Sequence, residues 1–122
     1  MIPHFDPPLS AEMIRDGGSL AMSFDSSGQE FWLFFPLLTD HTGMRTGYDS
    51  PIVINRTLDT QATITWEDAA SWLRHGLEQM EEDHHKKWAS IMLEVALTRG
   101  LLPQEISPII GGKTNPSPSP TP

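Results

Sequence analysis

The chain contains no cysteine and few basic residues. Its 122 residues include 8 Lys and Arg against 16 Asp and Glu, which gives a formal net charge of −8 at pH 7. The absence of cysteine excludes a disulfide framework, a cysteine zinc site, an iron–sulfur cluster and a thiol nucleophile. Nucleic acid is not an expected partner, because binding to a phosphate backbone needs clustered Lys and Arg.

Long hydrophobic runs are also missing. The longest extends from Phe31 to Leu38, and these eight residues are too few to cross a bilayer, which takes about 20. The N-terminal sequence MIPHFDPPLSAEM has neither a basic run nor a continuous apolar stretch, which argues against a secretory signal. We therefore expect a cytoplasmic protein without membrane contact, folded as a single domain over residues 1–110.

Alternating apolar residues predict a β-hairpin in the first third of the chain. Leu20, Met22 and Phe24 would share one side of a first strand, and a second strand would cover residues 30–37. The sequence between them, 25–28, has the composition of a turn. The second strand is apolar on both faces. We expect a helix on one face and the N-terminal segment, the C-terminal tail or a second subunit on the other.

The remaining short elements are predicted from local signals. Residues 51–55 and 60–65 are rich in β-forming residues and would form a second hairpin, after a polar loop at 39–50. Ser10 is a fair N-cap and Gly17–Gly18 would terminate a helix, so one or two helical turns are expected over Ser10–Asp16.

The strongest pattern begins at Thr65, which resembles the N-cap of a capping box. Apolar residues then recur about every 3.6 residues from Trp66 to Val95. This predicts either one helix over residues 66–99, about 50 Å long, or two helices broken near 81–87. The unbroken phase favours the single helix.

Together these elements predict a two-layer α+β fold, in which a roughly four-stranded antiparallel sheet packs against a long C-terminal helix. A helix of this length would extend beyond a sheet with strands of five to seven residues. Apolar residues on the extension, such as Trp88, would then need another chain to cover them. We therefore expect a homodimer or a partner-binding face.

An acidic and aromatic surface is the predicted binding site. Acidic residues cluster near the middle of the predicted helix, where no local structural need explains them, and tryptophan is frequent at interface hot spots. The predicted partner-binding residues are Glu78, Glu81, Glu82, Asp83, Trp72 and Trp88. The negative charge of this surface favours a basic protein as the partner.

Two alternatives involve chemistry. Glu81, His84 and His85 include a Glu-x-x-His pair of the kind that holds metals in helical bundles, although the sequence offers a single copy. His41 lies in the polar loop 39–50 among other ionisable residues, where an acid–base site could form. Neither cluster completes a known ligand set or nucleophile motif, so we predict no metal, no cofactor and no enzymatic activity.

Size, charge and element order resemble those of two kinds of bacterial protein, the immunity proteins that neutralise secreted toxins and the dimeric chaperones of secretion systems. The resemblance implies a non-catalytic protein-binding role. It rests on no motif, so no residue is carried over. The alternative is a structural homo-oligomer, such as a small virion or assembly component, with the long helix as subunit interface. Residues 111–122, GGKTNPSPSPTP, predict a flexible tail.

Overall fold

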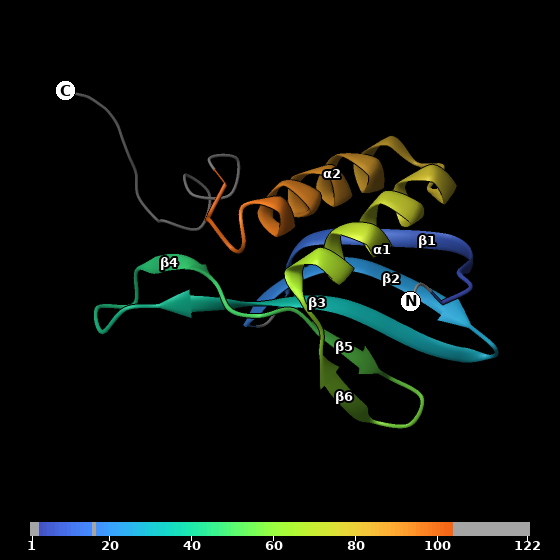
Figure 1. The fold of residues 1–122 in the computed structure, drawn as a ribbon, viewed down its shortest axis with the longest axis horizontal. Coiled ribbons are helices and arrows are strands. Elements are labelled where there is room, and N and C mark those ends of the chain that lie inside the picture. The colour runs from blue at the N-terminus through green and yellow to red at the C-terminus, as the bar shows by residue number, and fades with distance from the viewer. Residues whose placement is uncertain (1–2, 16, 104–122) are drawn as a thin grey trace.

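The computed structural model describes residues 3–15 and 17–103. The described elements are β1 (Asp6–Arg15), β2 (Gly18–Ser26), β3 (Gln29–Thr39), β4 (Arg45–Tyr48), β5 (Ile52–Asn55), β6 (Thr60–Thr63), α1 (Trp66–Gln79) and α2 (Asp83–Leu97). The strands form one antiparallel sheet in the order β1-β2-β3-β5-β6, with β4 paired to the end of β3. Both helices lie together at the β1 side of the molecule (Figure 1).

The α+β class is confirmed, but the predicted size of the sheet is wrong. Six strands form it instead of about four, because a strand replaces the predicted N-terminal helix and the predicted loop 39–50 contains β4. The hairpin expected from residues 51–55 and 60–65 corresponds to β5 and β6. The predicted tail 111–122 lies outside the described residues, as do residues 104–110 of the predicted domain. Neither helix of the described part is long and apolar enough to cross a membrane.

The first hairpin is confirmed, with its turn one residue later than predicted. Ser26 pairs with Gln29, and the two residues between them connect β2 to β3. Ser27 and Gly28 have φ angles of 52° and 79°. Two consecutive residues in this left-handed region form the tight connection whose twist matches that of the paired strands.

A bulge in β2 changes which side chains face the helices. Leu20 lies opposite Phe34, whereas Met22 lies opposite Leu33, so the register shifts at Ala21. Ala21 and Met22 belong to the core under the helices, and Leu20 is buried on the other face of the sheet. The expectation that Leu20 and Met22 share one side is therefore wrong, because an inserted residue reverses the alternation.

The helical turns predicted over Ser10–Asp16 are also wrong, since residues as far as Arg15 belong to β1. Phe5, Leu9 and Ala11 are buried in the core. Their burial outweighs the local capping signal at Ser10. The position of β1 at the edge of the sheet also explains why Pro7 is tolerated within it, because an edge strand does not need every N–H for pairing.

The predicted single helix over 66–99 is wrong, and the chain forms a helical hairpin instead. Met80 and Glu82 have extended backbones, with φ and ψ of −76° and 142° and of −89° and 134°. The break extends from Met80 to Glu82 and so overlaps the start of the 81–87 region named in the two-helix alternative. Met80 turns into the core, and α2 returns beside α1 (Figure 1). No helix of the described chain extends beyond the sheet as a single long rod.

Both helices bury apolar stripes on the same face of the sheet. Trp66 packs edge-on against Phe35, with ring centroids 5.2 Å apart, and Trp72 packs edge-on against Phe24 at 5.9 Å. The N-cap prediction at Thr65 is confirmed, because its Oγ1 accepts a hydrogen bond from the N–H of Asp68 at 3.0 Å. The main sheet contacts of the helices are with β1 and β2, so they cover only part of the sheet.

Candidate functional site

The predicted acidic residues gather at one end of the helical hairpin. Glu78 lies in the last turn of α1, Glu81 and Glu82 lie in the connection, and Asp83 begins α2. All four are exposed. Their proximity follows from the turn between the helices rather than from a shared face of one helix.

The predicted tryptophans do not stand free beside this acidic turn. Trp72 is half-buried and packs against the rings of Phe5 and Phe24. Trp88 is half-buried against the core, with Lys87 Nζ 5.4 Å from the centre of its ring. Both indoles therefore contribute to packing.

A half of the sheet that the helices leave partly exposed is the feature that sequence reasoning missed. It consists of β5, β6 and the part of β3 that pairs with β5, and we call it the open half-sheet. Ile52, Val53 and Ile54 alternate between the two faces of β5, and each remains partly exposed. A strand that is apolar on both faces is normally covered on both. The apolar PIVIN sequence signals a strand with two apolar faces, but it does not signal that these faces stay partly exposed.

On the face away from the helices, the pairing register brings four apolar side chains together. Ile52 lies opposite Phe34, and Ile54 lies opposite Trp32. All four are partly exposed. The guanidinium of Arg56 lies 4.1 Å from the centre of the Trp32 ring, which holds the indole in place by a cation–π contact. Within the described chain, both helices pack on the opposite face.

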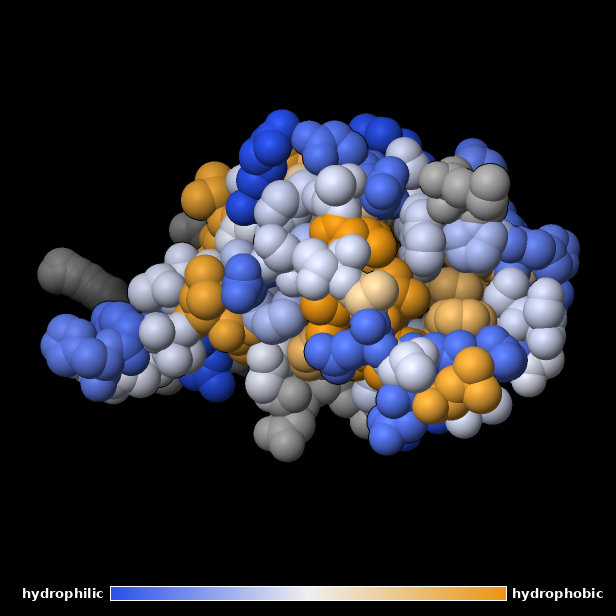
Figure 2. Space-filling model, turned by 60° about the horizontal axis from the view of Figure 1, so that its bottom comes forward, coloured by the Kyte–Doolittle hydropathy of each residue, from blue (hydrophilic) through white to orange (hydrophobic). Residues whose placement is uncertain are grey.

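The helix-facing side of the open half-sheet is also apolar. A hollow of about 220 Å³ is lined by Pro3, Phe24, Phe31 and Trp72. The rings of Phe24 and Phe31 stack at 5.5 Å. β5 and β6 lie at the bottom of Figure 1, and Figure 2, which brings that side forward, shows apolar residues gathered in the middle with polar residues around them.

Acidic residues form a row on the face away from the helices. Asp6 lies directly opposite Asp25 across β1 and β2, and Asp25 lies directly opposite Glu30 across β2 and β3. Glu30 accepts a hydrogen bond from the Trp32 Nε1–H at 3.1 Å, which places this carboxylate beside the apolar residues. Like charges directly opposite one another across strands are destabilising. The open half-sheet therefore has an acidic border.

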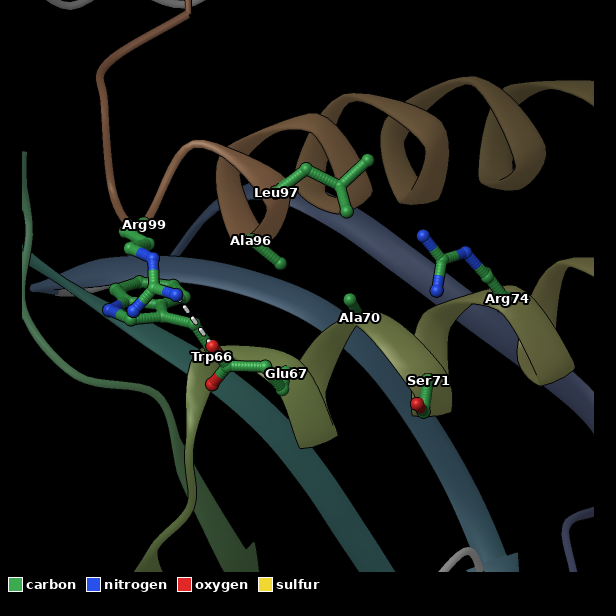
Figure 3. Close-up of a pocket in the computed structure, with 8 residues that line it drawn as sticks. All are labelled: Trp66, Glu67, Ala70, Ser71, Arg74, Ala96, Leu97 and Arg99. Carbon is green, nitrogen blue, oxygen red and sulfur yellow. Dashed lines mark hydrogen bonds and ion pairs between the residues drawn. The ribbon is translucent and has the colours of Figure 1, made fainter.

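A second groove lies between the first turns of α1 and the end of α2. It encloses about 380 Å³ and has small residues, Ala70 and Ala96, between the helices. Figure 3 shows Arg99 at one end of the groove and Arg74 at the other. At the first end, Arg99 pairs with Glu67 at 2.7 Å. The groove could hold a small anionic group, although the ion pair already occupies one of its two guanidinium groups.

The loop around His41 forms a turn, and its ionisable residues have structural roles. Asp40 Oδ1 accepts hydrogen bonds from the hydroxyl and the N–H of Thr42, at 2.6 and 2.8 Å. These bonds, the hydroxyl first, lower the pKa of Asp40. Burial raises the pKa of Tyr48, although its hydroxyl lies 2.9 Å from Ser19 Oγ, a bond that acts in the opposite direction. His41 itself is exposed.

Three comparisons with known proteins leave the family open. No family model matches the chain, and neither the curated proteins nor the solved structures contain a match.

Proposed function

We propose that this chain is a non-catalytic protein-binding module whose docking surface is the open half-sheet. The observation that carries the proposal is the partial exposure of Ile52, Val53 and Ile54 on both faces of one strand. Apolar surface gathered in this way is typical of protein interaction sites. The proposal keeps the class of function expected from the sequence, with the interface moved from the acidic helical turn to the sheet.

The charge of the border favours a basic partner. Asp6, Asp25 and Glu30 lie opposite one another in neighbouring strands, where their mutual repulsion costs free energy in the isolated chain. Lys or Arg side chains of a partner would relieve that repulsion while its apolar residues cover Trp32 and Phe34. Immunity-like and chaperone-like roles both fit this class of interaction.

A homo-oligomer is the second candidate, and the edge strand β6 favours it. All four residues of β6 are exposed, and an open strand edge can pair with the same edge of a second copy. Over residues 66–99, the long helix expected to form the subunit interface is replaced by α1 and α2. Two chains of net charge −8 that meet at acidic borders would repel each other, so we favour the basic partner.

Site-specific photo-cross-linking tests the proposal. A photoreactive amino acid at Ile54 should give one defined adduct with a basic protein in the cells that naturally make this chain. The same group at Leu97, which is 52% exposed on α2, is the matched control and should give no such adduct. An adduct of twice the 13.6 kDa chain mass would instead support the homo-oligomer.

Charge variants sharpen the test. Once the partner is identified, Asp25→Asn and Glu30→Gln should weaken its binding several-fold at low salt and much less at high salt, because screening already removes part of the attraction. Equal cross-linking from positions 54 and 97, or none from position 54, would overturn the proposal.

A further inference from the structure

Three side chains with metal-ligating atoms meet where α2 begins. Glu82 Oε1 lies 3.5 Å from His84 Nδ1 and 4.0 Å from His85 Nε2, and one ligand atom from each side chain lies within 4.8 Å of the other two. These separations exceed those of good hydrogen bonds. Two ligands on one tetrahedral zinc ion, with bonds of about 2.1 Å, are separated by about 3.4 Å. The spacing therefore suits an ion held between the three side chains.

The backbone of β1 holds His85 in an orientation that suits a ligand. His85 Nδ1 lies 3.1 Å from both the N and the O of Ala11. When Nδ1 carries the proton, it donates to the Ala11 carbonyl and leaves Nε2, the atom that faces Glu82, free to bind a metal. A ligating histidine usually makes this kind of second hydrogen bond. In the other tautomer, Nδ1 accepts from the Ala11 N–H, so either form keeps a hydrogen bond.

Glu82 has no helix-capping role that would explain its position. It is the N-cap residue of α2, but its carboxylate makes no capping hydrogen bond. Its Oε1 faces the two imidazoles instead. The side chains of Glu82 and His84 are 68% and 62% exposed, so an ion can reach them and water can complete its coordination.

The neighbouring charges also permit a cation here. The N-terminus of a helix carries partial positive charge, which disfavours a bound cation. Glu81 and Asp83 flank Glu82 in the sequence and supply negative charge that opposes this effect.

We propose that Glu82, His84 and His85 bind one divalent transition-metal ion, with zinc as the best match to two imidazoles and a carboxylate. The ligand set differs from the one suggested by the sequence, because Glu82 takes the place of Glu81. The ion would connect the interhelical turn to α2 and, through His85 and Ala11, to β1. The site is separate from the open half-sheet and does not depend on the proposed interface.

Calorimetric titration of the full chain with zinc chloride tests the site. We expect one ion per chain, and at least a tenfold loss of affinity in His84→Ala and in Glu82→Gln. His84 is the better variant to change than His85, because removing His85 would also remove the hydrogen bonds to β1. His75→Ala and Glu94→Gln are matched controls, since both residues are exposed and lie outside the cluster.

Thermal melting supplies a second readout. Zinc should raise the melting temperature of the unaltered chain and of both controls, but not that of His84→Ala or Glu82→Gln. The proposal would be overturned if zinc produced neither binding heat nor a melting shift in the unaltered chain. It would also fail if His84→Ala and Glu82→Gln bound zinc as tightly as the controls.

Discussion

The guanidinium of Arg99 lies 2.7 Å from the carboxylate of Glu67, which joins the end of α2 to the first turn of α1 across 32 residues of sequence. In one continuous helix the same two residues would be about 48 Å apart. Their contact therefore marks the return of the chain on itself and closes one end of the groove between the helices.

This ion pair should contribute little to stability. The two side chains are 70% and 65% exposed, and exposed pairs contribute about 0–1 kcal/mol. Urea unfolding of Glu67→Gln, Arg99→Gln and the double variant should give a coupling free energy in this range, smaller at high salt. A coupling above about 2 kcal/mol would mean that the pair is far less hydrated than its exposure indicates.

Gly76→Ala should destabilise the protein although alanine is the better helix former. A Cβ at Gly76 would meet Met22 Sδ and would lie 3.4 Å from Leu9 Cδ2, and the Met22 side chain is fully buried. Helix propensity favours alanine by about 1 kcal/mol, whereas overpacking costs about 1–3 kcal/mol. We expect a net loss of about 1 kcal/mol in urea unfolding.

A cavity variant provides the control for this prediction. In a Met22→Ala background the space beside residue 76 is free, so Gly76→Ala should there be neutral or stabilising. If Gly76→Ala stabilised the unaltered chain as well, α1 would not approach the sheet as closely as described.

Tyr48 should ionise at higher pH in the folded chain than in the unfolded chain. Burial raises the pKa of its hydroxyl above the ordinary value of 10.0. Between the unfolded and folded pKa values the unfolded chain has already lost the proton, so this group lowers the free energy of unfolding as pH rises above about 10. Below about pH 10 it contributes no pH dependence.

The measurement is direct, because the chain contains one tyrosine. Absorbance of the tyrosinate should show the raised pKa in folded protein and the ordinary value in urea. Ser19→Ala removes the hydrogen bond that lowers the pKa, so it should raise the value further. Tyr48→Phe should lose the part of the pH dependence of unfolding that comes from Tyr48 and keep the part that comes from lysines. An ordinary pKa in the folded chain would contradict the burial of the hydroxyl.

Asp25→Asn should stabilise the isolated protein. Asp25 lies between Asp6 and Glu30 in the row of opposing carboxylates, and cross-strand charge pairs change stability by about 0.2–1 kcal/mol each. The gain should be largest at low salt in urea unfolding. Glu94→Gln, an exposed change on α2, is the control and should have no comparable effect. A loss of stability in Asp25→Asn would show that the row is held together by other contacts.

Features set by a few neighbouring residues could be predicted from the sequence. The tight connection at Ser27 and Gly28 and the N-cap at Thr65 depend on local backbone chemistry, and both were anticipated. The alternation along β3 also indicated two apolar faces. These signals lie within a few residues of the structure that they determine.

Features set by distant contacts could not be predicted in the same way. The break at Met80 contains no glycine or proline, and it is stabilised by burying Met80 in the core. The apolar stripe keeps its phase across the break because both helices pack on the same sheet. Burial of Leu9 in an edge strand likewise depends on α1 and α2, which follow it by more than fifty residues.

The candidate sites were missed for the same reason. Which half of the sheet the helices cover is a tertiary property, so the exposure of Ile52 to Ile54 could not be read from their sequence. The metal-ligand set assumed the spacing of a continuous helix, which pairs Glu81 with His84. The extended backbone of Glu82 brings its carboxylate to the histidines instead.

The dependence of β1 on α2 also has a consequence for biosynthesis. Ala11 contacts His85 across 74 residues of sequence, so the helix that packs on β1 leaves the ribosome long after β1 itself. At about 5–20 residues per second, roughly 3–12 s pass between synthesis of Thr39 and synthesis of Leu97. Throughout that interval the nascent β1–β3 sheet exposes the apolar face that the helices later cover. Until α2 is made, that exposed apolar face makes the nascent chain prone to aggregation.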